Sequence, residues 1–136
     1  MLPFPNPRCR MAKKIAIAIL VVFLILFAYL QSRYISSSYK ELTEAAGNIG
    51  VTIQNQDIEK TNESIDAFGV IWENNSETWM SLILHEHVDS VYQNYLLMKE
   101  YARLGDLKLA SVYLRQLEYA LKDVESLDHM SIKNIF

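Results

Sequence analysis

The sequence predicts an all-α protein in which one N-terminal transmembrane helix precedes four helices arranged as two antiparallel hairpins. An uninterrupted apolar run over residues 15–30 indicates the transmembrane helix. Beyond it, apolar residues recur at spacings of about three and four, which is the period of an amphipathic helix. Asp57 and Asp106 stand immediately before two of these stretches, at the position that a helix N-cap takes.

The apolar run reads IAIAILVVFLILFAYL and contains no charged residue, no Gly and no Pro. It lies within the 18 residues between Lys14 and Arg33, which as a helix would span about 27 Å. This length nearly matches the hydrocarbon core of a bilayer, which is about 30 Å thick, and Tyr29 can lie at its interface. The lipid bilayer is therefore the predicted partner of residues 15–32.

The charges on the two sides of the run predict an orientation. Residues 1–34 carry five cations and no acid, whereas residues 35–136 carry 8 cations and 16 acids, a net charge of −8. By the positive-inside rule the basic tail, residues 1–14, is cytoplasmic and the helical domain over residues 36–128 is extracytoplasmic. An acidic domain lacks the basic footprint of a nucleic-acid-binding protein, so no nucleic-acid partner is predicted.

A cleaved signal peptide is the alternative to a membrane anchor. Such peptides have an apolar core of about 7–15 residues that ends at a small-x-small cleavage site. The apolar run here is longer, and Ala28 has the large Leu26 two residues before it. The segment is therefore predicted to be an uncleaved signal anchor of a single-pass protein. The one cysteine, Cys9, lies in the cytoplasmic tail, so packing alone must hold the outer domain.

Four helices are expected after the span. The first begins near Ser38, the second follows Asp57 and ends at Asn74-Asn75, the third is capped by Ser76, and the fourth follows Asp106. A shift of 49 residues places the apolar stripe of the first helix onto that of the third, and the second onto the fourth. This repeat of pattern predicts two matching hairpins, either in a compact bundle or as a TPR-like pair.

A short histidine-containing stretch is the candidate for metal chemistry. His85 and Asp89 are four residues apart and can share a helix face, as two metal ligands would. On a stripe through Met80, Leu84, Val91 and Met98, however, His87 falls near the core direction, which predicts a core or interface histidine beside an exposed His85–Asp89 pair. A site would also need a further ligand such as Glu86 or His129. No metal or cofactor is therefore predicted, and His85, His87 and Asp89 remain the residues of an alternative sensing site.

Aromatic residues suggest an interaction surface. Trp72 and Trp79 flank the Asn-Asn-Ser stretch and are expected to close the join between the hairpins. Tyr92 falls well off the stripe that carries Tyr95, so its ring should reach a surface. Trp72, Trp79 and Tyr92 are accordingly the candidate interaction residues, as in helical-repeat proteins that bind peptides in a groove.

The chain ends in Ser131-Ile132-Lys133-Asn134-Ile135-Phe136. This ending, the anchor, Trp79 and the His85-x3-Asp89 spacing resemble the domain-of-unknown-function 4363 family, single-pass membrane proteins of clostridia and related Firmicutes. The resemblance covers about residues 12–136. It implies membrane anchoring and a helical extracytoplasmic domain, and it brings no activity and no catalytic residues. The apolar tip of residues 129–136 is expected to pack back onto the helices.

The predicted function follows from the charge asymmetry and the paired hairpins. The sequence contains no Gly-rich phosphate loop, no nucleophile elbow and no Cys/His cluster, and it offers no assembled acid–base or nucleophile set, so an enzyme is not predicted. The leading interpretation is a non-enzymatic, membrane-anchored interaction or scaffold module with a protein partner. The alternative is an extracytoplasmic ligand- or metal-sensing domain that uses the region from His85 to Asp89.

Overall fold

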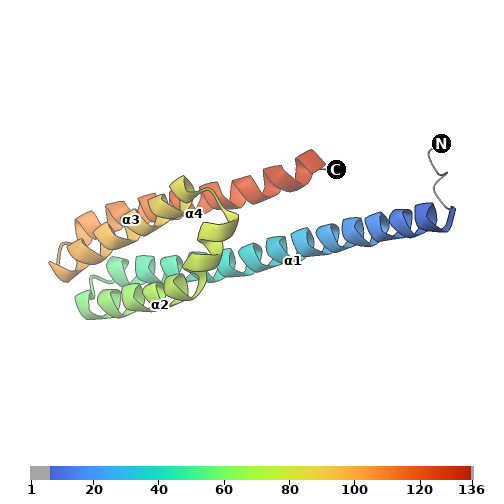
Figure 1. Cartoon of the computed structure of the whole chain (residues 1–136). Coiled ribbons are helices and arrows are strands. Elements are labelled where there is room, and N and C mark those ends of the chain that lie inside the picture. Colours follow the sequence, from blue (N-terminus) through green and yellow to red (C-terminus); the bar gives the residue numbers. More distant parts are fainter. Residues whose placement is uncertain (1–6, 136) are drawn as a thin grey trace. The chain divides into compact units, whose positions relative to one another are not determined.

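A computed structural model describes residues 7–135, and all elements in that range are α-helices (Figure 1). The four helices are α1 (Pro7–Gln54), α2 (Ile58–Leu82), α3 (His85–Arg103) and α4 (Leu107–Ile135). The predicted all-α class is thus confirmed. The chain divides into two compact units, Met1–Tyr34 and Ile35–Phe136, and α1 contributes to both.

The N-terminal unit contains the apolar part of α1. Its large apolar side chains between Ile15 and Leu30 are 47–65% exposed, and no residue of its most apolar window is buried. A helix that exposes apolar side chains on all sides is not expected to be stable in water. This part of α1 is therefore a candidate membrane span by length, composition and exposure.

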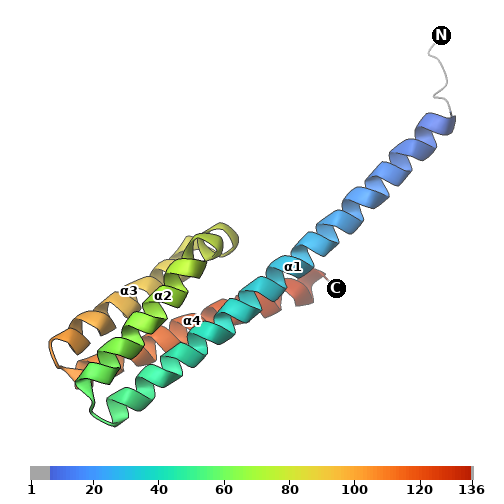
Figure 2. The same ribbon diagram turned by 90° about the horizontal axis from the view of Figure 1, so that it is seen from below.

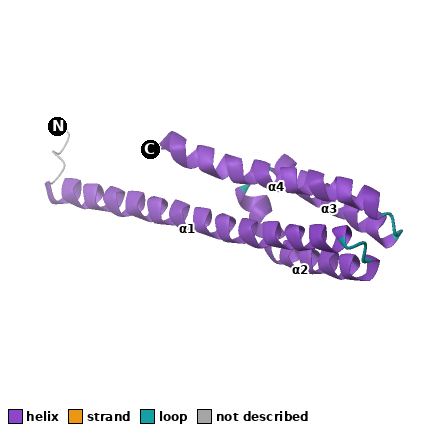
Figure 3. Ribbon diagram, turned by 180° about the vertical axis from the view of Figure 1, so that it is seen from behind, coloured by secondary structure: helices purple, strands orange, loops and turns teal. Residues whose placement is uncertain are grey.

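The C-terminal unit is a four-helix bundle in which successive helices alternate in direction. The α1/α2 and α3/α4 turns lie at one end of the bundle and the α2/α3 connection at the other (Figures 2 and 3). Trp79, near the end of α2, bonds to Ser38 on α1, and Phe68 on α2 stacks on Tyr95 of α3. The unit is thus a compact bundle, one of the two arrangements that the sequence left open.

The bundle also closes between its first and last helices. A Cβ atom at Gly50 of α1 would lie 3.6 Å from the side chain of Leu114 on α4. Eleven residues toward the start of α1, the phenol of Tyr39 interacts with the carboxylate of Glu125, further along α4, so the two helices are antiparallel. Burial raises the pKa of the Tyr39 phenol; a hydrogen bond with Thr43 opposes this, and the Glu125 carboxylate adds to it. Each helix therefore contacts two neighbours.

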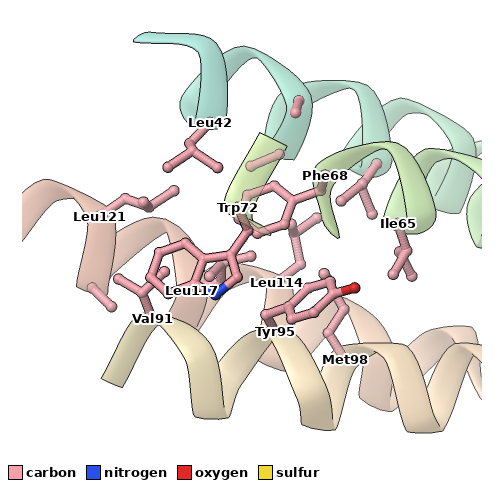
Figure 4. Packing of buried hydrophobic residues seen from close by; sticks show 14 of the residues in the cluster. Leu42, Ile65, Phe68, Trp72, Val91, Tyr95, Met98, Leu114, Leu117 and Leu121 are labelled. Carbon is pink, nitrogen blue, oxygen red and sulfur yellow. The ribbon is translucent and has the colours of Figure 1, made fainter. Parts of the chain in front are cut away.

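All four helices contribute to one hydrophobic core (Figure 4). The periodic apolar positions of the sequence supply it, with spacings of three and four along each helix. Each large side chain so buried stabilises the fold by about 1.5–3 kcal/mol. The fully buried members include Leu42, Ile49, Ile65, Phe68, Trp79, Val91, Met98, Leu117 and Leu121.

The 49-residue repeat reappears in the two hairpin turns. Gln56 and Gly105 both adopt positive φ, +54° and +78°, and the next residue, Asp57 or Asp106, accepts a 3.0 Å hydrogen bond from the backbone N–H three residues on. The helix-ending hydrogen bonds of Gln56 to Ile53 and of Gly105 to Ala102 also correspond. Both turns are therefore Schellman motifs followed by an Asp N-cap.

Gln56 occupies the position that favours glycine in the first turn. Gln56→Gly should raise the free energy of unfolding by about 1 kcal/mol, because a side chain in the left-handed region costs about that much. The reverse change in the matching turn, Gly105→Gln, should lower it by a similar amount. Urea denaturation of the full chain in detergent micelles measures both, and a loss of stability in Gln56→Gly would contradict the turn assignment.

The predicted boundary at Asn74-Asn75 is wrong, because α2 continues through it to Leu82. Asn75 is buried and its side-chain amide donates to the carbonyl of Ile71 at 2.8 Å, so it satisfies a helical carbonyl rather than ending the helix. Ser76 is likewise internal to α2 and caps nothing. The break comes at Ile83 and Leu84, where the backbone is extended at Ile83.

Two further expectations concern the ends of the domain. The separate helix predicted from Ser38 is not separate, because helical backbone runs from Pro7 to Gln54. Four helices therefore stand where five were expected. Helix α4 extends to Ile135, but the side chains of residues 128–136 lie outside those that the structure describes, and the expected packing of the apolar tip falls there.

Candidate functional site

A groove between α2 and α3 is the candidate functional site of the bundle. It has a volume of about 450 Å³. Its lining combines aromatic and aliphatic side chains with a few polar ones: Gly69, Trp72, Glu73, Ser76, Met80, Tyr92, Tyr95, Leu96 and Lys99. We call it the α2/α3 groove. It has the composition of a recognition site, which is mostly apolar with a small number of placed polar groups.

The aromatic rings at the groove form a connected set. Trp72 stacks on Tyr92 with ring centroids 6.2 Å apart and planes 11° from parallel. Trp72 also meets Trp79 edge-on at 5.9 Å, and Tyr92 lies 6.4 Å from Tyr95. Contacts of this kind are worth about 0.5–1.5 kcal/mol each beyond the area that they bury. The groove therefore has a rigid aromatic floor.

Neither tryptophan belongs to the open surface: Trp72 lines the groove, whereas Trp79 is not among its lining residues. Trp72 is 3% exposed and Trp79 is fully buried. The indole N–H of Trp79 donates to the Ser38 hydroxyl at 2.8 Å, and that hydroxyl in turn donates to the carbonyl of Ile35 at 3.1 Å. Trp79 thus joins α2 to α1, and it is not available to a partner in this fold.

Three apolar side chains lie at the open rim of the groove, together with the exposed Glu73. Tyr92, Met80 and Leu96 are 42%, 43% and 44% exposed. The sequence indicates Tyr92 as a surface residue because it departs from the core stripe, and in the structure it lies at the rim. Met80 and Leu96 were missed. The i,i+4 spacing of Tyr92 and Leu96 could have indicated that Leu96 lies on the same helix face. The predicted start of this helix at Ser76, well before His85, obscured that relation.

A charged network closes one end of the groove. The ammonium group of Lys99 lies 3.1 Å from the carboxylate of Asp66 on α2, donates to the Tyr95 hydroxyl at 3.3 Å, and stands 5.6 Å from the centre of the Tyr95 ring. The Asp66 carboxylate, followed by the Tyr95 hydroxyl, raises the pKa of Lys99. Lys99 therefore remains a cation at neutral pH and ties α3 to α2 beside the groove.

Gly69 permits the close approach of α2 and α3. A Cβ atom at this position would overlap the Tyr95 hydroxyl. We expect Gly69→Ala to lower the free energy of unfolding by about 1 kcal/mol, because overpacking outweighs the gain in helix propensity. In a Tyr95→Phe background the same change should cost less or stabilise. Denaturation of the wild-type chain, the two single variants and the double variant measures this, and equal effects of Gly69→Ala in both backgrounds would contradict it.

The candidate metal residues are not brought together as a site. His85 and Asp89 are exposed on the first turns of α3, and His87 is half-buried. Among the described residues, no group of three His, Cys, Asp or Glu side chains could hold a metal ion, and the side chain of His129 lies outside that part of the chain. His87 lies beside the core and not in it, because Met80 and Leu84 are exposed and the core stripe of α3 runs through Val88.

Comparison with known proteins identifies a family match that spans the bundle. The family model described as Domain of unknown function (DUF4363) matches residues 29–135. The match begins later than the expected residue 12 and covers residues 35–135 of the helical bundle unit. No curated protein matches the chain, and no solved structure does. By the extent of this match, the chain belongs to the DUF4363 family.

Proposed function

We propose that this protein is a membrane-anchored, non-enzymatic interaction module that binds an apolar segment of a protein partner in the α2/α3 groove. Residues 15–32 would span the membrane, with residues 1–14 in the cytoplasm and the bundle outside. The observation that carries the proposal is the half-exposed Tyr92 ring, which is stacked on the buried Trp72 at the open rim of the groove.

The exposure of the apolar run and the charges on its two sides support the proposed membrane anchor. The apolar side chains of residues 15–30 are exposed on all sides of α1, and transfer into lipid would remove that surface from water. Four cations precede the span, and the acidic domain follows it. This asymmetry supports a cytoplasmic N-terminus.

The pre-organised geometry of the α2/α3 groove supports its role in partner binding. Binding costs side-chain ordering of about 0.5–1.5 kcal/mol per immobilised residue, and Tyr92 avoids part of that cost because its ring is already stacked. Partly exposed aromatic and methionine side chains are enriched where proteins bind one another. A volume of about 450 Å³ accommodates a few side chains of a partner. Tyr92, Met80 and Leu96 make most of the rim apolar, so the partner should present aliphatic or aromatic residues.

Site-specific photocrosslinking tests the groove. A benzoylphenylalanine at Leu96, introduced into the full chain in cell membranes, should give one discrete adduct on irradiation. Tyr92→Ala in the same chain should abolish that adduct. Val51 on α1 is 56% exposed and lines no part of the groove, so the probe placed there is the matched control and should give no such band. The same adduct from both positions, or none from Leu96, would count against the proposal.

The alternative function, metal or ligand sensing, depends on His85, His87 and Asp89. Zinc titration of the full chain in detergent distinguishes it from the interaction module. A saturable rise in melting temperature that His85→Ala removes would favour a sensor. The interaction module requires no such rise.

A further inference from the structure

The outer face of α4 carries a stripe of cations and apolar residues. Lys108, Val112, Arg115, Tyr119 and Lys122 follow one another at spacings of four and three, and all five are exposed. They lie opposite the buried stripe of α4 that includes Leu117 and Leu121. The stripe is about 21 Å long. We call it the basic stripe.

Two features make the basic stripe unusual in this domain. Its three cations are among only eight in residues 35–136, which carry 16 acids. Among the described residues, none of the three takes part in an ion pair, whereas Lys60 and Lys99 each do. Tyr119 between them is 64% exposed and Val112 is 46% exposed. Tyr and Arg are enriched where proteins bind one another, and the stripe places both, exposed, on one helix face.

A groove of the opposite charge lies between α1 and α2. It has a volume of about 280 Å³, with Glu41 and Glu44 on one wall and Ala45, Ala67 and Ile71 among the apolar residues that line it. Both carboxylates are exposed. Residues 35–82, which form this hairpin, carry eight acids and two cations. We call this the acidic groove.

We propose that the protein self-associates head to tail, with the basic stripe of one copy docked in the acidic groove of the next. The small side chains of the groove leave room for Tyr119 and Val112, and the cations beside them would meet Glu41 and Glu44. The stripe and the groove share no residue, because α4 contributes nothing to the groove. The contact is therefore heterologous, and it generates rings or open chains rather than a closed two-fold dimer.

The charges favour a second copy over an acidic surface of another kind as the occupant of the basic stripe. The domain as a whole has a net charge of −8, so a uniformly anionic surface would repel most of it. The acidic groove of a second copy places two carboxylates, Glu41 and Glu44, beside an apolar lining that Tyr119 and Val112 could cover. Each rim ion pair contributes about 1 kcal/mol or less, so the charges select the partner and the buried apolar side chains provide most of the affinity.

Charge reversal in the full chain, studied in a non-ionic detergent by analytical ultracentrifugation, tests the proposal. The wild-type chain should form oligomers larger than a dimer, and about 1 M salt, where screening is strong, should weaken their association without abolishing it. Arg115→Glu alone and Glu44→Arg alone should each weaken association by about tenfold or more. An equimolar mixture of the two variants should regain association, because every contact then joins opposite charges.

Two outcomes overturn this proposal. A wild-type chain that stays monomeric excludes self-association, and variants that remain monomeric when mixed show that the stripe and the groove do not meet. Both substituted side chains are exposed, so each variant should keep the fold of the wild-type chain. Circular dichroism of each variant checks this. Tyr92→Ala is the matched control: it should leave the oligomers unchanged. The result is therefore independent of partner binding in the α2/α3 groove.

Discussion

Replacing Trp79 by alanine should lower the free energy of unfolding by about 3–5 kcal/mol, the largest loss expected from a single core substitution in this bundle. The side chain is fully buried, contacts Trp72 edge-on, and donates the hydrogen bond that joins α2 to Ser38 on α1. Small domains have a total stability of about 5–15 kcal/mol, so the variant should be partly unfolded at 37 °C. Urea denaturation of the full chain in detergent measures the change.

Two milder substitutions separate the packing of Trp79 from its hydrogen bond. Ser38→Ala leaves the indole N–H buried without an acceptor and should cost about 1–3 kcal/mol. Trp79→Phe removes the donor and part of the volume. In Trp79→Phe the further change Ser38→Ala should then cost much less, because the group that Ser38 satisfied is gone. Equal costs of Ser38→Ala in the two backgrounds would exclude the hydrogen bond as a stabilising contact.

Two arginines in the apolar run, Val22→Arg and Leu26→Arg together, should prevent stable insertion into the membrane. Each change disfavours insertion by about 3 kcal/mol near the centre of a span. The variant chain should therefore move from the membrane fraction to the soluble fraction or be degraded. Fractionation of cells followed by immunoblotting measures the distribution.

The matched control places the same two charges on the bundle. Val51 and Leu104 are 56% and 71% exposed, so Val51→Arg with Leu104→Arg should leave the chain in the membrane fraction. If the variants with arginines in the run also remained there after carbonate extraction, residues 15–32 would not be the anchor.

The parts of the fold that could be predicted are those determined within a few neighbouring residues. The apolar stripes and the caps at Asp57 and Asp106 depend on local spacing and on a side chain that reaches a backbone N–H three residues away. The end of α2 could not be predicted in this way. Asparagine is common at helix ends, yet Asn75 is buried in the bundle, and its amide donates a hydrogen bond to the carbonyl of Ile71 in the same helix.

The candidate site shows the same division. Tyr92 could be selected because its position conflicts with the core stripe of its own helix. Met80 and Leu96 could not be assigned to a common site, because their proximity depends on how α2 and α3 pack around Gly69. The burial of Trp79 could not be predicted either, since its partner Ser38 lies 41 residues earlier in the chain.

Labelling of single cysteines in intact cells tests the central claim, an oriented anchor with the bundle outside, most directly. Cys9 is the only cysteine of the chain, and Leu104→Cys in a Cys9→Ser background places one on the bundle at a 71% exposed position. A membrane-impermeant maleimide should label the bundle cysteine at once and Cys9 only after lysis, with both chains full-length in the membrane fraction. Labelling of Cys9 in intact cells, protection of the bundle cysteine, or a shortened labelled chain would contradict the account.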